Sequence, residues 1–315
     1  MKIIIGHSSP DLDAITSVWL IKRFLPGWED AVVRFVPAGE RIGKSAEVAP
    51  PGRGSPRNAI EKIGDDEVIH VDTGLGPLDH HQVADTNVCA ASLTFDFVKR
   101  VQNSEFRIQS SEGVKDRMEA VGRMVKVVVD VDHFKEVFWK DPTADYHEFS
   151  LVGILDGLKV QRPDQDEYYV GFVMQCLDAV LHEFENRIWA EREIKEKGKK
   201  FKTRYGRGIG FETINDTVIK LSQKMGYVIV VRKDPRKGYV RIKAKPLSTI
   251  NNQQSTINKN IDLTLVYERL KKMDPQATWF LHIGRKMLLN GSVKNPKMKP
   301  TKLSLTEIIK VLEKI

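Results

Sequence analysis

The sequence is poor in cysteine and has no long apolar run, and each shortage excludes a class of protein. Only two of its 315 residues are cysteine, Cys89 and Cys176, which is too few for a disulfide framework or a cysteine-rich zinc site. No apolar stretch approaches the roughly 20 residues that a transmembrane helix needs. Any bound metal must therefore be held by histidine and carboxylate side chains.

The N-terminal segment also lacks the features of a secretory signal, which are a basic start, a long apolar stretch and a small-residue cleavage site. We therefore expect a cytoplasmic protein with no membrane association. With 41% hydrophobic residues, the chain is long enough for two domains that each have a core. No internal repeat is apparent.

Charge is distributed unevenly along the chain. Residues 1–160 contain 19 Lys and Arg against 25 Asp and Glu, a net charge of −6; subtraction from the totals of 50 and 42 leaves 31 against 17, a net of +14, for residues 161–315. A lysine-rich surface is often merely solvated, and a Lys- and Glu-rich composition also occurs in heat-adapted proteins. An acidic half suited to divalent cations, joined to a basic half suited to polyanions, nevertheless suggests a phosphate-containing substrate.

Predicted strands alternate with predicted helices in the first half. The sequence predicts strands at residues 2–6, 31–36 and 67–72, and helices at residues 13–25 and 88–101, with a further short helical piece just before the third strand. This alternation predicts an α/β fold with a doubly wound parallel sheet in a domain spanning residues 1–160.

Residues 161–315 are expected to form a second, smaller and basic α+β domain. We predict a helix from about Tyr168 to Lys199 and two paired strands in "GYVIVVRKD" and "GYVRIKAKP". The last helix, "SLTEIIKVLEKI", begins with a Ser-x-x-Glu capping box. The polar segment at residues 248–260 is predicted to be a loop.

Acidic and imidazole side chains gather directly after two of the predicted strands. These residues are His7, Asp11, Asp13, Asp72, Asp79, His80 and His81. Because the carboxyl ends of parallel strands meet at one edge of a sheet, we expect them to converge. Taken singly, each is more often a cap, a turn residue or a surface group; Asp11 or Asp13, for example, suits the N-cap of the following helix. Taken together, they favour a metal site.

A further carboxylate is predicted from a helical stripe. The apolar residues of the stripe are spaced by four and three: Val114, Met118, Val121, Val125 and Val128. The next step of four falls on Asp132, whereas Asp130 falls on the opposite face. A carboxylate directed inward has to be paired or to bind metal, because burying it alone is costly. We therefore favour Asp132, although either aspartate could simply end the helix.

Three ordered motifs carry a resemblance to a known family. "HSSPDLDA", "VDTG" and "LDHH" resemble motifs I, II and III of the DHH phosphoesterase superfamily, which includes RecJ exonucleases, family II inorganic pyrophosphatases, exopolyphosphatases and small-nucleotide phosphatases. "DHHQ" and the later "WFLHIGRKMLLNGS" are similar to the melanocyte-proliferating-gene family of DHH-like RNA exonucleases. The superfamily resemblance covers residues 1 to about 135.

The resemblance implies two divalent cations, Mn²⁺ or Mg²⁺. One would be held by His7, Asp11 and Asp72, and the other by Asp13, Asp72, His80 and Asp132, with Asp72 bridging. Oxygen ligands with a few imidazoles suit these ions, and such a pair lowers the pKa of a shared water and neutralises charge on a phosphoryl group. The catalytic residues implied are Asp79, His80 and His81: Asp79 would orient a histidine, and His81 would contact the phosphate or protonate the leaving oxygen.

A basic cluster in the second half is a candidate substrate-binding site. Its residues are Arg285, Lys286, Asn290, Gly291, Ser292 and Lys294. Glycine beside Asn and Ser lets backbone N–H groups approach an anion, and the cations would add affinity. An ordinary basic turn before the last helix accounts for the same residues equally well.

The function implied is that of a dimetal phosphoesterase acting as an exonuclease on short RNA or DNA oligonucleotides. One alternative is a phosphatase of pyrophosphate, polyphosphate or a small nucleotide. Another is a non-catalytic protein that binds nucleotides or nucleic acid on a DHH-like scaffold. The complete ligand set argues against the last, because an idle site has no physical need to keep mutually repelling carboxylates together.

Overall fold

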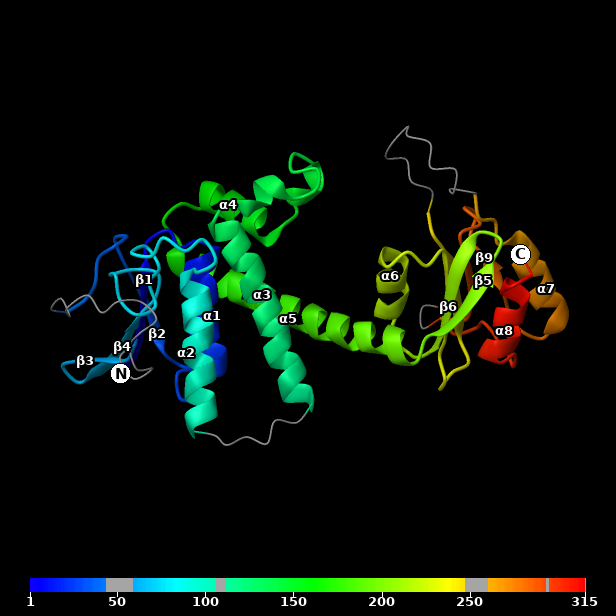
Figure 1. The fold of residues 1–315 in the computed structure, drawn as a ribbon, viewed down its shortest axis with the longest axis horizontal. Coiled ribbons are helices and arrows are strands. Elements are labelled where there is room, and N and C mark those ends of the chain that lie inside the picture. The colour runs from blue at the N-terminus through cyan, green and yellow to red at the C-terminus, as the bar shows by residue number, and fades with distance from the viewer. Residues whose placement is uncertain (44–58, 106–111, 247–259, 293–294, 315) are drawn as a thin grey trace. The chain divides into compact units, whose positions relative to one another are not determined.

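The computed structural model describes residues 1–43, 59–105, 112–246, 260–292 and 295–314. They form two compact units, Met1–Glu185 and Asn186–Ile315, which divide within the long helix α5 (Asp166–Glu196) (Figure 1). The predicted boundary at residue 160 lies in the last turn of α4 (Leu151–Gln161). The two units divide further along the chain, between Glu185 and Asn186. Within the described ranges, no helix is long and apolar enough to cross a membrane.

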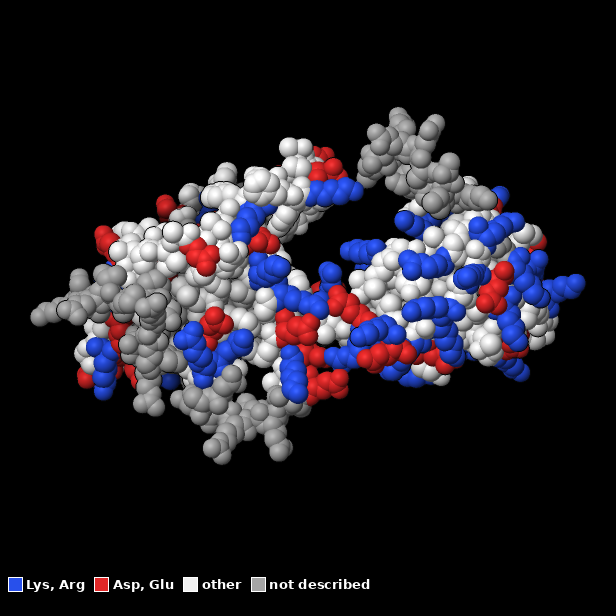
Figure 2. All heavy atoms as spheres, viewed as in Figure 1, with Lys and Arg blue, Asp and Glu red and all other residues white. Residues whose placement is uncertain are grey.

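The two units differ in charge more strongly than the two halves of the sequence. Residues 1–185 contain 20 Lys and Arg against 31 Asp and Glu, a net of −11; the remaining 30 against 11 give residues 186–315 a net of +19. Blue side chains of Lys and Arg accordingly crowd the drawn face of the second unit (Figure 2). The second unit is therefore strongly basic, whereas the first is acidic.

The first unit contains a four-stranded sheet in the order β2-β1-β4-β3. Strand β1 (Lys2–His7) pairs in parallel with β2 (Val32–Val36) and with β4 (Asp66–His70). Parallel pairing brings the carboxyl ends of β1 and β4 to the same edge. The predicted α/β class is confirmed, and the three predicted strands are present.

The short helical piece predicted before β4 is wrong. Residues Glu61–Ile63 form strand β3, which pairs antiparallel with β4. Gly64 has a φ of +61°, and with Asp65 it forms a two-residue turn that places Ile63 opposite Asp66. The sheet is therefore mixed, with one antiparallel strand at its edge.

Three helices of the first unit pack on one another. They are α1 (Leu12–Phe24), α2 (Ala90–Glu105) and α3 (Glu112–Asp132). The start of α1 and the end of α3 carry acidic residues of the predicted site. Val121, Val125 and Val128 of the predicted stripe on α3 are buried, whereas Val114 in its first turn is exposed. Short helices η2 (Lys135–Phe138) and η3 (Asp145–His147) lead from α3 to α4.

The second unit is built on a six-stranded sheet in the order β5-β6-β7-β8-β10-β9. The strands are β5 (Lys199–Thr203), β6 (Gly206–Glu212), β7 (Ile229–Lys233), β8 (Val240–Ala244), β9 (Phe280–Leu281) and β10 (Met287–Asn290). Strands β7 and β8 pair antiparallel as predicted, and only β6 and β7 are parallel. The loop predicted at residues 248–260 lies, except for Asn260, outside the described residues.

Both faces of this sheet are apolar and covered by helices. Helices α7 (Thr264–Met273) and α8 (Leu305–Leu312) pack on one face, and α6 (Thr217–Lys224) packs on the other with the last turns of α5. The predicted capping box is present at α8, where Ser304 and Glu307 satisfy each other's backbone N–H groups. The predicted helix at residues 168–199 corresponds to α5.

Candidate metal centre

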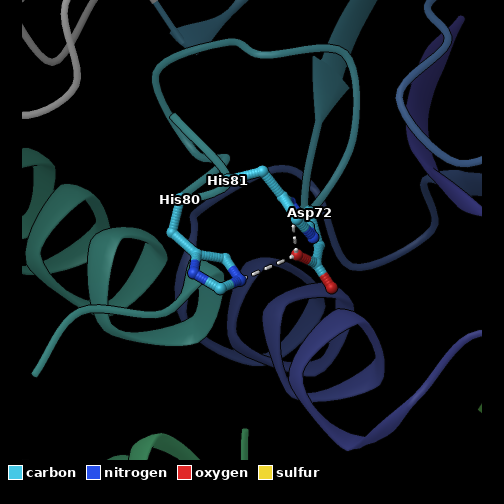
Figure 3. Close-up of side chains that lie close together, drawn as sticks. All are labelled: Asp72, His80 and His81. Carbon is cyan, nitrogen blue, oxygen red and sulfur yellow. Dashed lines mark ion pairs between the residues drawn. The ribbon is translucent and has the colours of Figure 1, made fainter. Parts of the chain in front are cut away.

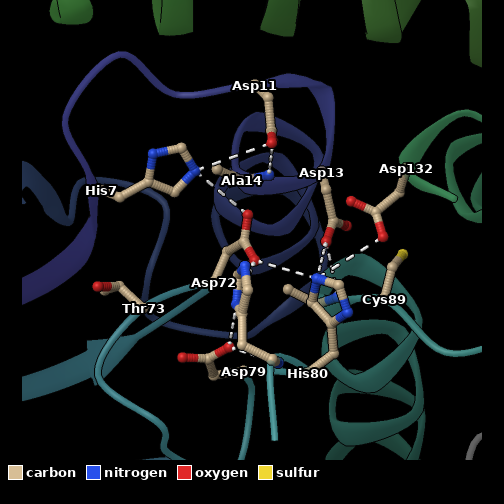
Figure 4. Close-up of polar contacts among 12 residues, drawn as sticks. His7, Asp11, Asp13, Ala14, Asp72, Thr73, Asp79, His80, Cys89 and Asp132 are labelled. Atoms are coloured by element: carbon tan, nitrogen blue, oxygen red, sulfur yellow. Dashed lines mark hydrogen bonds and ion pairs between the residues drawn. The ribbon is translucent and has the colours of Figure 1, made fainter. Parts of the chain in front are cut away.

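Two neighbouring strands deliver the first pair of predicted ligands. His7 is the last residue of β1, and Asp72 follows β4 after one intervening residue. The backbone N–H of Val71 donates to the carbonyl of Ile5 over 2.8 Å, so the two strands stay paired almost to Asp72. His7 Nε2 consequently lies 3.3 Å from Asp72 Oδ2 (Figure 4).

Asp72 lies between two groups of potential ligands. Its backbone has a φ of +53°, in the left-handed region, and its N–H donates to the carbonyl of Leu78. One carboxylate oxygen, Oδ2, faces His7, and the other, Oδ1, lies 3.5 Å from His80 Nε2 (Figure 3). The buried carboxylate of Asp72 is therefore shared by both groups.

On the His7 side, Asp11 combines the two roles considered for it. Its Oδ1 accepts a hydrogen bond from the backbone N–H of Ala14 as the N-cap of α1, and its Oδ2 lies 4.0 Å from His7 Nε2. His7 Nδ1 lies 2.9 Å from the carbonyl of Ser8, so a proton on Nδ1 leaves Nε2 for the cluster. Burial lowers the pKa of His7, but the hydrogen bond to Asp72 and nearby carboxylates outweigh it and raise that pKa to about 9.

On the other side, one imidazole nitrogen faces three carboxylates. His80 Nε2 lies 3.5 Å from Asp72 Oδ1, 3.6 Å from Asp132 Oδ2 and 3.7 Å from Asp13 Oδ2. Each carboxylate comes from a different part of the fold: the loop after β4, the end of α3 and the first turn of α1. The sheet and two helices thus place four of the predicted ligands together (Figure 4).

Asp13 is fixed by the start of another helix. Its two oxygens accept hydrogen bonds of 2.7 Å from the backbone N–H groups of Ala90 and Ala91, which begin α2. Burial, and then the charge of Asp72, raise the pKa of Asp13 well above its usual value. Burial also raises the pKa of Asp132, although His80 opposes the rise. Both carboxylates would gain from a neighbouring cation.

The structure distinguishes the two aspartates at the end of α3. Asp132 Oδ2 lies near His80 Nε2 and 3.7 Å from His133 Nε2, whereas Asp130 Oδ1 lies 3.8 Å from Lys135 Nζ. The helical stripe therefore selected the aspartate that reaches the cluster. His133, which adjoins Asp132 in the sequence and was not among the predicted ligands, lines the same cavity.

The cluster has unsatisfied oxygens that fit a cation. Asp72 Oδ1 and Asp132 Oδ2 are buried and have no hydrogen-bond partner within the described part of the chain. A buried carboxylate oxygen without a partner is costly, and divalent cations such as Mn²⁺ and Mg²⁺ prefer oxygen ligands. Candidate ligand atoms of His7, Asp11 and Asp72 lie within 4.8 Å of one another, as do those of Asp72, His80 and His81. The donor set therefore fits divalent metal.

Asp79 and His81 form a separate pair beside the cluster. Asp79 is buried, and its Oδ1 accepts from His81 Nδ1 over 2.7 Å and from the His81 backbone N–H over 3.1 Å. Its Oδ2 accepts from the backbone N–H of Leu75. Burial lowers the pKa of His81, but the hydrogen bond and charge of Asp79 outweigh it, so that pKa is raised. Asp79 thus orients His81, the arrangement that the resemblance implies.

All side chains of the cluster except the buried Asp13, together with Asp79, His81 and His133, border one open cavity of about 510 Å³. Ala38, Gly39 and Leu75 complete its lining.

One supporting residue, Arg41, was not indicated by the sequence. Arg41 Nη1 donates to the carbonyl of Gly74 over 2.8 Å, and its Nη2 pairs with Glu61, which also lies 3.4 Å from His70 Nδ1. Arg41 therefore tethers the loop that follows Asp72. No spacing rule connects it to the motifs.

The predicted substrate-binding residues of the second unit are largely engaged in the fold. Arg285 Nη1 lies 3.0 Å from Asp262 Oδ2, and Lys286 Nζ donates to the carbonyl of Ile261 over 2.6 Å. Lys294 lies outside the described residues. The cations that are described in this cluster thus have partners within the unit.

The neutral residues of the same basic cluster stabilise the turn in which they lie. Asn290 is 0% exposed; its Nδ2 donates to the carbonyls of Thr278 and Lys299, and its Oδ1 accepts from the N–H of Thr301. The polar atoms of Asn290 are therefore not available to an anion. Gly291 has a φ of +79°, and a Cβ there would lie 2.1 Å from the ring of Tyr239. Ser292 forms an isolated bridge with Asn295.

Comparison with known proteins adds no family assignment. A scan against protein-family models finds no match, and a search of curated proteins finds none either.

Proposed function

We propose that this protein is a metal-dependent phosphoesterase of the DHH type. The observation that carries the proposal is the position of Asp72, whose two carboxylate oxygens face His7 on one side and His80 on the other. A shared carboxylate between two sets of oxygen and imidazole ligands is suited to two adjacent cations. The parallel strands that present these ligands are compatible with a doubly wound DHH-type domain.

The ligands fall into two sets that share Asp72. The first set is His7, Asp11 and Asp72, and the second is Asp13, Asp72, His80 and Asp132. Bound Mn²⁺ or Mg²⁺ would activate a water for attack on phosphorus and neutralise charge on the phosphoryl oxygens. The buried pairing of Asp13 with the start of α2 would hold the second set rigid.

We expect His81 to contact the substrate. It borders the cavity, and Asp79 fixes its ring by accepting from Nδ1. The other ring nitrogen, Nε2, would then contact a phosphate oxygen or give a proton to the leaving oxygen. The raised pKa of His81 favours the protonated ring that either role requires.

We propose that the substrate is a phosphodiester in a short RNA or DNA oligonucleotide. The net charge of +19 on residues 186–315 supports a polyanion longer than a single phosphate. Pyrophosphate, which would need only the metal centre, leaves this charge unexplained.

The test is hydrolysis of bis-p-nitrophenyl phosphate and of an end-labelled 20-mer RNA in Mn²⁺, with EDTA as the stopping reagent. Asp72→Asn should abolish both activities, because it removes charge from the shared ligand while keeping its shape. The matched control is Asp130→Asn on α3, since Asp130 pairs with Lys135 outside the cluster. Full activity of the Asp72→Asn variant would overturn the metal assignment. Rapid hydrolysis of pyrophosphate without shortening of the RNA would support the phosphatase alternative.

A further inference from the structure

A histidine outside the predicted ligand set adjoins the second set of ligands, which is Asp13, Asp72, His80 and Asp132. His133 directly follows Asp132, and its Nε2 lies 3.7 Å from Asp132 Oδ2. The rings of His133 and His80 meet edge to face, with their centroids 5.8 Å apart at an angle of 87°. Two ligands of the set therefore have His133 as a direct neighbour.

A hydrogen bond connects His133 to the segment that holds a third ligand. The Nε2 of His133 lies 2.9 Å from the carbonyl of Val88. Val88 is two residues before Ala90, and the backbone N–H groups of Ala90 and Ala91 donate to the two oxygens of Asp13 over 2.7 Å. His133 thereby fixes the chain just before the donors on which the orientation of Asp13 depends.

The carbonyl of Val88 lies just outside helix α2. Residues 84–87 are exposed and Cys89 is 0% exposed, so Val88 lies where an exposed loop enters the buried start of the helix. N–H groups in the first turn of α2 donate to the carbonyl of Cys89, one residue further on. The donor that the structure shows for the Val88 carbonyl is the ring of His133, and a partly buried carbonyl that loses its donor is unfavourable.

The chain turns sharply after α3, directly beyond His133. The N–H of His133 still donates to the carbonyl of Val129 in the helical pattern, but Phe134 has a φ of +53°. A bulky residue in the left-handed region is unfavourable and persists where surrounding contacts fix it. Beyond this turn Lys135 Nζ donates to the carbonyl of Thr86, an exposed contact further from α2. Of the two contacts, that of His133 is the one that adjoins the start of α2.

We propose that His133 is a positioning residue of the second set, which holds Asp132, His80 and the backbone donors of Asp13 in one arrangement. The inference rests on the proposed function, because it takes these residues to bind a cation. A group that supports metal ligands in this way fixes their orientation without touching the metal.

The rival interpretation is that His133 is itself a ligand, because candidate ligand atoms of His80, Asp132 and His133 lie within 4.8 Å of one another. The hydrogen bond to Val88 favours the positioning role. A carbonyl can only accept, so Nε2 of His133 carries the proton. The same Nε2 lies near Asp132 Oδ2, so the ring faces that carboxylate with a donor and not with a free lone pair.

The test compares two amide replacements that differ in reach. The side-chain nitrogen of His133→Gln can take the place of Nε2 and donate to Val88, whereas the shorter side chain of His133→Asn cannot. Amide hydrogen exchange, measured by NMR in EDTA, reports this contact without metal. His133→Asn should speed exchange at Ala90 and Ala91 about 5-fold, and His133→Gln should restore the original rates. Amides of β1 should exchange alike in all three proteins, which excludes general loosening of the unit.

The second readout is Mn²⁺ affinity, measured by isothermal titration calorimetry. His133→Asn should weaken binding about 10- to 100-fold, and His133→Gln should bind nearly as the unaltered protein does. Electron spin-echo spectroscopy at saturating Mn²⁺ should show the same imidazole nitrogens with and without His133. The matched control is His147→Asn, since His147 Nε2 also lies 3.1 Å from a backbone carbonyl, that of Asp141, but outside the cluster. It should change neither exchange at α2 nor affinity.

The outcomes separate the proposal from its rival and from the proposed function. Unchanged exchange at Ala90 and Ala91 in His133→Asn overturns the proposal. Loss of an imidazole nitrogen signal, or a Mn²⁺ affinity of His133→Gln as weak as that of His133→Asn, also overturns it and makes His133 a ligand. Faster exchange in a protein that binds no Mn²⁺ supports the positioning of Asp13 and rejects the metal centre. Restored Mn²⁺ affinity in His133→Gln, without phosphodiester hydrolysis by the unaltered protein, supports the proposal and rejects the proposed function.

Discussion

Asp79 holds His81 through two contacts, since its Oδ1 lies 2.7 Å from the ring Nδ1 and 3.1 Å from the backbone nitrogen. These two hydrogen bonds to one oxygen fix both the ring and the turn that carries it. It also sets a proton on Nδ1, because a carboxylate oxygen can only accept. The histidine therefore presents its other nitrogen in a defined direction, which is what a group acting on a bound phosphate requires.

The first prediction concerns the charge of this pair. Asp79→Asn should lower the pKa of His81 toward its ordinary value, because the main opposing influence, burial, remains while the charge and the strong hydrogen bond are lost. NMR titration of the His81 ring, in EDTA and with Asp79→Asn beside the unaltered protein, measures the change. Histidines outside the cluster should titrate identically in both. An unchanged His81 titration would show that Asp79 does not control its proton.

The same pair predicts how stability depends on pH. The folded pKa of His81 is raised, so the pair contributes fully below the unfolded pKa of about 6.5 and loses its contribution as pH rises through the folded pKa. The difference in unfolding free energy between the unaltered protein and Asp79→Asn should therefore shrink as pH increases across that window. A difference that grows with pH would contradict this reading.

The gathering of acidic and imidazole side chains was largely predictable from the sequence, because strand ends and helix periodicity are local features. His7 and Asp72 follow from two buried strands whose parallel pairing joins their ends, and Asp132 follows from the apolar stripe of α3. Arg41 was not predictable, because its contact with Gly74 depends on the path of a loop. The sequence left open whether Asn290 binds an anion or belongs to an ordinary turn, for a related reason: its burial depends on backbone carbonyls that are distant in the sequence.

The second prediction concerns stabilisation by metal. A ligand that binds only the folded state at 100 times its Kd adds about 2.7 kcal/mol, which for a unit of this size raises the melting temperature by about 5–10 °C. Mn²⁺ should produce such a rise, and EDTA should reverse it. Asp132→Asn should reduce the rise, whereas Asp130→Asn should keep it. Differential scanning fluorimetry decides, and equal rises in both variants would remove Asp132 from the ligand set.

The third prediction assigns Arg41 a positioning role. Arg41→Ala releases the carbonyl of Gly74 and leaves Glu61 beside His70 without its guanidinium partner. Loosening the loop after Asp72 should weaken Mn²⁺ affinity about 10- to 100-fold, the usual effect of removing a group that supports a ligand. Calorimetric titration with Mn²⁺ measures this, with Arg34→Ala on β2 as the control, since Arg34 is exposed. Unaltered affinity would show that the loop holds its shape without Arg41.

The last prediction separates residues of the second unit that support the fold from those that bind a polyanion. Asn290→Ala removes a buried side chain that makes three hydrogen bonds, so it should destabilise the unit by at least about 2 kcal/mol. It should leave the salt dependence of RNA binding unchanged, because the side chain is not exposed. Urea unfolding and salt titration of the same variant test both statements.

Exposed cations on β5 should behave in the opposite way. Lys200 and Lys202 are exposed, and Lys202 lies directly across the strands from Arg207, a like-charge pair that works against folding. Replacing both lysines by alanine should therefore not lower stability. If each contacts one phosphate of a single strand, the slope of log K against log salt should fall by about 1.4 in total, at about 0.7 per contact. A slope that stays the same in this double variant, or falls in Asn290→Ala, would place the polyanion elsewhere on the unit.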